Sequence, residues 1–163
     1  MNISDILIAE LDMESAGTKK VLDRIPESNL IWKPHDKSMM IGRLGLHIAE
    51  LPDWIIRCLT SEEYNFGVGP YQPTFPSAKG DILRVFDEKL TKAKDAIRST
   101  SDEQFAKHWK LRKGDFLIFD LPRPAVVRRQ INHIIHHRGQ LSVYLRLLGV
   151  PVPGLYGPSA DEK

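Results

Sequence analysis

The stretch INHIIHHRGQLSVYLR, residues 131–146, decides how this sequence folds and where its chemistry lies. Apolar residues recur in it every three or four positions, which is the spacing of one face of an α-helix. The same stretch holds His133, His136 and His137 within five positions. Which of these histidines share the apolar face therefore decides whether the helix can carry a binding site.

His133 and His137 are predicted to face inward together. At about 100° per residue from His133, the apolar stripe centres near 70°, with His137 near 40° and His136 near 300°. The i, i+4 spacing stacks the two rings one turn apart, ~6 Å between Cβ atoms, so both can reach one metal ion. His136 is predicted to point outward, into solvent or a subunit contact.

A histidine from an earlier predicted helix completes a candidate metal site. In GRLGLHIAELPDW, residues 42–54, His47 lies at the inner edge of an apolar stripe. That stripe consists of Leu44, Ile48, Leu51 and Ile55. Three histidines that converge from two helices form a recognised metal arrangement. The alternative stays open that the histidines are half-buried core residues bonded to their neighbours, because a helical HxxxH pair also occurs by chance.

Glu50, Gln140 and Tyr144 are weaker candidates for catalytic roles. Glu50 follows His47 by three residues and could supply a fourth ligand or hydrogen-bond to a ligand, although a charged helix face is the commoner explanation. Gln140 and Tyr144 lie on the histidine side of the last helix, where they could orient a ligand or polarise a substrate. Packing and a satisfied hydroxyl are the alternative for each.

The other histidines and the cysteine are predicted to lie outside the site. Cys58 comes eleven residues after His47, ~16 Å along a continuous helix, which is too far to bind the same ion. It is predicted to be a small buried residue. His35 and His108 have no partner at a suitable spacing, so both are expected on the surface.

The periodicity of the whole chain predicts an all-α four-helix bundle. Helices are expected over about residues 4–25, 38–59 and 77–99, and from Pro124 to about Leu148, with Gly149 as a C-cap. Pro52 should kink the second helix or begin a new segment, because it removes a backbone hydrogen bond.

Two segments break the helical pattern. Residues 107–120, KHWKLRKGDFLIFD, predict a β-hairpin before the last helix, with strands over 107–112 and 115–120 around a Lys113–Gly114 turn. Two strands alone are marginally stable, so they must pack on the helices. Residues 60–76 are rich in glycine, proline and aromatic residues, which predicts a long surface loop and a candidate lid.

Composition limits the class of protein. A chain of 163 residues without repeats predicts one domain, residues 1–163. The 23 basic and 21 acidic residues are scattered, which does not favour nucleic acid or an anionic membrane as partner. A single cysteine excludes an intrachain disulfide and suits a reducing cytoplasm. No signal peptide or membrane-spanning segment is indicated.

The sequence resembles the DinB-like proteins of the DinB/YfiT superfamily, a bacterial group of four-helix bundles with metal sites. The likeness is strongest in NHIIHHRGQLSVYLRLLGVPVPGLYGPSADE, residues 132–162. IGRLGLHIAELPDW, residues 41–54, is similar to the second helix of that family, and the hairpin fits its layout. The correspondence covers essentially the whole chain.

The resemblance implies properties of the site, the fold and the assembly that the residues alone do not show. It places the family's metal triad on His47, His133 and His137, and it implies an up-down-down-up bundle, a divalent ion such as zinc or nickel, and frequent homodimers. Outward-facing residues on the last helix, Ile135, His136 and Val143, are the local hint of a contact surface. Characterised relatives include transferases and isomerases that use low-molecular-weight thiols. Nothing in the sequence indicates DNA binding.

Three functions fit these observations. The first is a metal-dependent enzyme, a thiol transferase, an isomerase or a hydrolase, in which three histidines leave one position open on the ion. The second is a non-catalytic stress protein that binds a metal or small ligand. The third is a helical interaction module whose histidines are core residues. A site closed by Glu50 would favour the second function over the first.

Overall fold

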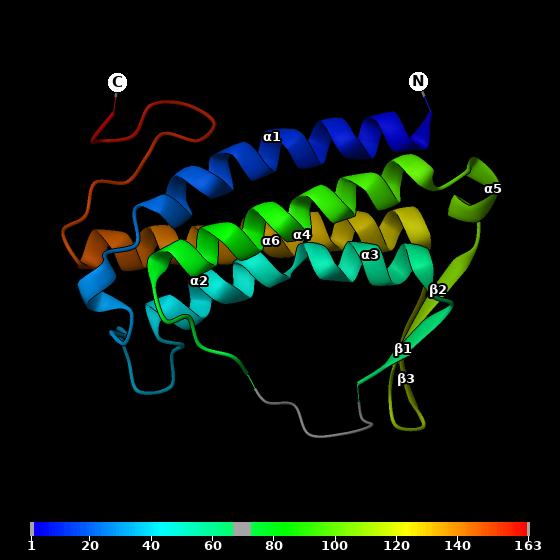
Figure 1. Cartoon of the computed structure of the whole chain (residues 1–163), viewed down its shortest axis with the longest axis horizontal. Helices are drawn as coiled ribbons and strands as arrows, with labels where there is room; N and C mark the ends of the chain where they lie inside the picture. The colour runs from blue at the N-terminus through cyan, green and yellow to red at the C-terminus, as the bar shows by residue number, and fades with distance from the viewer. Residues whose placement is uncertain (1, 67–72, 163) are drawn as a thin grey trace.

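Long helices lie side by side along one axis in the computed structural model, which describes residues 2–66 and 73–162. Figure 1 shows α2 and α3 following each other in one row of the bundle, so the described helices form four rows. The long helices are α1 (Ile3–Asp23), α2 (Ile41–Glu50), α3 (Pro52–Thr60), α4 (Lys79–Ser99) and α6 (Arg123–Leu147). A 3-10 turn, η1 (Glu27–Asn29), and the short helix α5 (Asp102–Phe105) complete the helical elements. The predicted helical fold is confirmed, and its four-row arrangement is that of a four-helix bundle.

Each helical row of the bundle packs against two of the other rows. Both α1 and the α2–α3 row pack against α4 and α6. In Figure 1, α1 and α6 run away from the end that carries the strands, whereas α2, α3 and α4 run toward it. The α2–α6 contact matters most for function, because it brings together the two sequence stretches that contain the candidate ligands.

The predicted break at Pro52 divides the second helical row. Helix α2 ends at Glu50, and Pro52 is the first residue of α3. At that position a missing N–H costs no hydrogen bond, because the first turn of a helix leaves its N–H groups unpaired. Helix α2 begins at Ile41, later than predicted, where Ile41 N donates to Trp32 O over 2.8 Å.

The strands form one small sheet at an end of the bundle. Its order is β1 (Glu63–Asn65), β2 (His108–Lys113) and β3 (Phe116–Pro122), with β1 parallel to β2 and β2 antiparallel to β3. The predicted hairpin is present, but its turn is Gly114–Asp115, one residue later than expected. Gly114 adopts a φ of +58°, which glycine reaches without a steric penalty.

Strand β1 corrects the prediction of a long surface loop over 60–76, since residues 63–65 are paired in a sheet. Three residues are too few to show an alternating pattern, so the strand depends on its pairing with β2. Trp109 of β2 holds the sheet on the helices: it is fully buried, and its indole N–H donates to Ser61 Oγ over 3.1 Å. Residues 67–72 of the proposed lid lie outside the described residues.

The core runs the length of the bundle in two clusters of buried apolar side chains. One lies around α2 and the later half of α6, and the other around α3, α5 and the sheet. Trp54 and Leu90 pack against both clusters and so join them. No described helix is long and apolar enough to span a bilayer.

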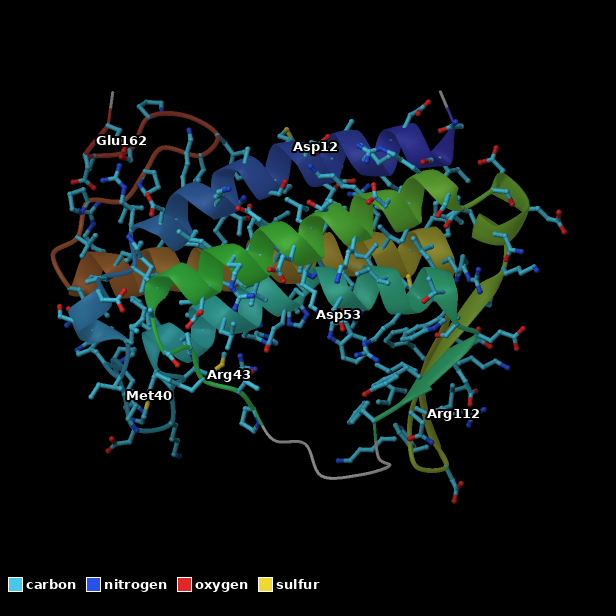
Figure 2. All side chains as sticks on the ribbon, viewed as in Figure 1. Asp12, Met40, Arg43, Asp53, Arg112 and Glu162 are labelled. Carbon is cyan, nitrogen blue, oxygen red and sulfur yellow. The ribbon has the colours of Figure 1, made fainter. Side chains whose placement is uncertain are left out.

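The C-terminal tail packs back onto the bundle at the end opposite the sheet, as Glu162 and Arg112 show in Figure 2. Helix α6 ends at Leu147 with Leu148 as its C-cap, so the predicted C-cap, Gly149, lies one residue further on. Its φ of +71° is the left-handed conformation that glycine adopts after a helix end. Beneath the tail, Arg138 of α6 pairs with Glu14 of α1 over 2.8 Å. Tyr156 of the tail donates to Glu14 Oε2 over 2.7 Å and so covers this buried pair.

Candidate metal centre

The structure brings His47, His133 and His137 together between α2 and α6. The Nε2 atom of His137 lies 2.9 Å from Nε2 of His133 and 3.2 Å from Nε2 of His47. One ligand atom from each of the three residues lies within 4.8 Å of the others. His137 is the innermost, with 9% of its surface exposed. Two helices far apart in the sequence thus present three imidazole nitrogens to one point.

The two nitrogen separations measured from His137 fit a shared ion. Two nitrogens bound to one zinc ion at about 2.05 Å lie roughly 2.9 to 3.4 Å apart for angles of about 90 to 110°. Both separations from His137 fall in that range. The residues present therefore suit a small divalent cation with nitrogen ligands.

Gln140 orients the central imidazole. Its Oε1 lies 2.7 Å from Nδ1 of His137, and its Nε2 lies 3.1 Å from Nε2 of His136. Because the amide oxygen only accepts, Nδ1 of His137 carries the proton and Nε2 presents its lone pair to the other two histidines. His136 is exposed, as predicted, yet it is joined to the site through Gln140.

The three imidazoles are neutral at neutral pH. Burial is the main cause that lowers the pKa of His47 to about 4. Electrostatic repulsion of a protonated His47 by His137, His133 and Arg43 lowers this pKa further. Burial also lowers the pKa of His133 to about 4, with His137, His136 and Arg129 contributing. Burial lowers the pKa of His137, and the hydrogen bond that His137 donates to Gln140 acts in the opposite direction. Neutral imidazole is the form that binds metals.

Glu50 lies beside the site but is engaged elsewhere. Its Oε2 accepts from Arg43 Nη1 over 3.0 Å, and its Oε1 accepts from Thr74 Oγ1 over 2.9 Å. The segment that follows residue 72 therefore returns beside α2, near Arg43 in Figure 2. Among the described residues, the group that could hold a metal consists of the three histidines without a carboxylate.

The remaining candidates lie away from the three histidines. Tyr144 packs edge-on against Trp32, with ring centroids 5.8 Å apart. Cys58 is fully buried, and its burial raises the pKa of the thiol to about 12, so it supplies no thiolate. His35 and His108 are exposed, and His108 pairs with Asp120 over 2.8 Å.

Sequence reasoning missed two arginines and the link from His136 through Gln140 to the site. Arg43 and Arg129 each stand four residues before a histidine of the site, His47 and His133 respectively. Both contribute to the lowered pKa of that histidine. The i, i+4 spacing was a usable signal for both arginines.

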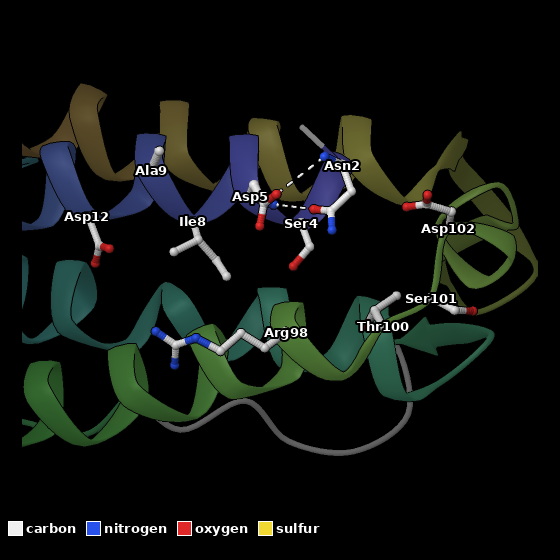
Figure 3. A pocket seen from close by; sticks show the side chains of 10 residues that line it. All are labelled: Asn2, Ser4, Asp5, Ile8, Ala9, Asp12, Arg98, Thr100, Ser101 and Asp102. Atoms are coloured by element: carbon white, nitrogen blue, oxygen red, sulfur yellow. Dashed lines mark hydrogen bonds between the residues drawn. The ribbon is translucent and has the colours of Figure 1, made fainter.

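A hollow lined by residues other than the three histidines lies between the start of α1 and the end of α4 (Figure 3). Its polar groups stabilise helix ends. Asp5 N donates to Asn2 Oδ1 over 2.8 Å in a capping box, and Ser4 Oγ donates to Ile97 O over 3.1 Å. Asn2 and Asp5 are therefore engaged in capping α1, and Ser4 joins α1 to α4.

The fold and the site define a class: a four-helix bundle with a three-histidine candidate metal site between two of its helices. The sequence model of the DinB family matches residues 5–163. The chain therefore belongs to the DinB family.

Solved structures share this fold. A DinB-like protein from Bacillus cereus ATCC 10987 is 22% identical, with a TM-score of 0.73 over 92% of this chain and 95% of that one. YfiT from Bacillus subtilis, described as a probable metal-dependent hydrolase with an unusual four-helix bundle topology, is 19% identical. Its TM-score is 0.67 over 90% of this chain and 87% of YfiT. A mycothiol-dependent maleylpyruvate isomerase is 10% identical, with a TM-score of 0.61 over 86% of this chain and 61% of the isomerase.

Proposed function

We propose that this protein is a metal-dependent enzyme in which His47, His133 and His137 hold one divalent ion. The observation that carries the proposal is the convergence of three Nε2 atoms, with separations from His137 of 2.9 and 3.2 Å. The hydrogen bond from His137 Nδ1 to Gln140 supports it, because metal-binding histidines are commonly oriented in this way. Zinc and nickel both accept imidazole ligands, and we propose one of them as the ion.

The site is proposed to be open on one side. Three imidazoles supply three of the four positions that zinc prefers, and Glu50 is held by Arg43 and Thr74. A divalent ion there would lower the pKa of a thiol or water and so supply a nucleophile at neutral pH. This arrangement favours catalysis over a non-catalytic metal-binding or ligand-binding role.

We propose two reactions, transfer or isomerisation that uses a low-molecular-weight thiol, and hydrolysis. The chain's own thiol, Cys58, is buried, so a thiol reaction would need an external thiol. The maleylpyruvate isomerase of similar fold is mycothiol-dependent, which supports the first reaction, and the description of YfiT supports the second. The direct assay combines small thiols with generic electrophiles and with esters or amides, each with and without the thiol.

The metal content of the untagged protein tests the site itself. We expect about one divalent ion per chain by elemental analysis. His47→Ala and His133→Ala should each lose it, whereas His136→Ala should retain it because His136 is exposed and lies outside the group of three. Stoichiometric metal in either of the first two variants would contradict the triad.

The bundle order, assembly and location belong to the same proposal. The helix directions in Figure 1 support an up-down-down-up order. A homodimer formed through the exposed side of α6, which carries His136 and Val143, is tested by light scattering of wild type and of Val143→Lys. Ile135, predicted to face outward with them, is half-buried against the core instead. A cytoplasmic location suits a chain with a single, reduced cysteine.

A further inference from the structure

A hollow of about 710 Å³ leads along α6 to His133. It is lined by Leu121 of β3 and by Ala125, Arg128, Arg129, Asn132 and His133 of α6. The α6 residues recur at i, i+3, i+4, i+7 and i+8, so they form one stripe on the helix. The stripe ends at His133, which makes the hollow an approach to the candidate metal centre.

The charged side chains that line this hollow are basic. Arg128 is paired with Glu10 of α1 over 3.1 Å, which neutralises it. The guanidinium of Arg129 instead lies over the ring of Phe119, 5.3 Å from its centroid. Within residues 2–66 and 73–162, no carboxylate pairs with Arg129. Its charge therefore remains available to a ligand.

Arg43 and Arg129, which precede two histidines of the site by one turn, also differ in whether a carboxylate pairs with them. Arg43 stands one turn before His47 and pairs with Glu50. Arg129 stands one turn before His133 without such a carboxylate among the described residues. Because three neutral imidazoles do not compensate the charge of a divalent ion, this side of the site would be strongly positive. A positive site next to the Arg129 guanidinium suits an anionic ligand.

We propose that Arg129 binds an oxyanionic group of the substrate, a carboxylate or a phosphate, while the reacting end of the substrate lies at the three histidines. Arg129 and His133 lie one turn apart on α6, ~6 Å along the helix axis, so one small substrate could contact both side chains. Asn132, three residues further along α6, lines the same hollow and offers a second donor, its side-chain amide. The inference rests on the proposed metal site and adds the class of its substrate.

Ligand titration of the cobalt(II)-loaded protein, followed by visible absorption, tests this role without an assay of turnover. Succinate and butyrate are the probes, because they share a four-carbon chain and differ in one carboxylate. We expect succinate to bind at least about tenfold more tightly than butyrate, which corresponds to one charge-assisted hydrogen bond. 3-Phosphonopropionate, with a phosphonate in place of one carboxylate, then shows which oxyanion is preferred.

Arg129→Gln should reduce the affinity for succinate to that for butyrate, with cobalt content and butyrate affinity unchanged. Arg128→Gln is the matched control and should keep the preference, because Arg128 is already paired with Glu10. Equal binding of the two probes by wild type, or an undiminished preference in Arg129→Gln, would overturn this inference alone. Failure of the wild type to bind cobalt would overturn the proposed metal site and the inference with it.

Discussion

The side-chain oxygen of Gln140 lies 2.7 Å from Nδ1 of His137, the central histidine of the candidate site. Gln140 is one turn further along α6, so helix geometry itself places the two side chains in contact. The bond keeps the proton on Nδ1 and aims Nε2 at His47 and His133. Gln140 therefore acts on the site by orienting another residue.

Replacing Gln140 should weaken metal binding without abolishing it. For Gln140→Leu we expect a loss of about 10- to 100-fold in affinity, the usual effect of removing a hydrogen bond to a metal-binding histidine. Gln140→Glu retains an acceptor and should bind close to wild type. Competition with a chromophoric chelator measures all three affinities. Unchanged affinity in Gln140→Leu would show that packing alone orients His137.

The metal-free protein should lose stability as the pH falls from about 6.5 to about 4. The pKa values of His47 and His133 are lowered from 6.5 to about 4 in the folded state. Between these values the unfolded chain binds protons that the folded chain does not, so the free energy of unfolding decreases with decreasing pH. Above pH 6.5 this contribution is fully present.

Chemical denaturation at several pH values, with a chelator present, measures this slope. The double variant His47→Ala/His133→Ala should flatten it between pH 4 and 6.5. His108→Ala is the control, because His108 is exposed and lies outside the site. A slope that persists in the double variant would assign the effect to other groups.

Removal of Glu14 should destabilise the fold strongly. The Glu14 and Arg138 side chains are 6% and 2% exposed, so Glu14→Ala leaves a buried guanidinium without its carboxylate. We expect a loss of about 3 to 5 kcal/mol in the free energy of unfolding. The control is Asp87→Ala, whose pair with Lys19 is about half exposed and should cost at most about 1 kcal/mol. Equal losses in urea denaturation would contradict this difference.

Gly42 permits a close contact at the start of α2. A Cβ there would lie 2.9 Å from Leu30 O, the same oxygen that accepts a hydrogen bond from Gly42 N. Gly42→Ala should therefore cost about 1 to 3 kcal/mol of stability. Gly139 lies inside α6, where a Cβ would meet no described neighbour within 4 Å, so Gly139→Ala should stabilise by about 0.5 to 1 kcal/mol. Thermal unfolding of both variants checks the opposite signs.

Much of the helical fold was predictable because helical periodicity is a local property. The α6 pattern placed His133 and His137 on one side and His136 on the other, and Pro52 marked the boundary between α2 and α3. Strand β1 was missed because its three residues form a strand only by pairing with β2, a partner more than forty residues away. Such pairing leaves no trace in a short local pattern.

The sequence by itself determined which side chains each helix presents to the core, since that follows from 3.6 residues per turn. Only the tertiary structure decided that His47 lies 3.2 Å from His137, that Arg43 and Thr74 hold Glu50, and that the Arg129 guanidinium lies over Phe119. These contacts join segments that are distant in the chain, and they depend on how the helices and the sheet pack. The periodicity of a helix determines which of its residues share a face, whereas tertiary packing determines which residues that face contacts.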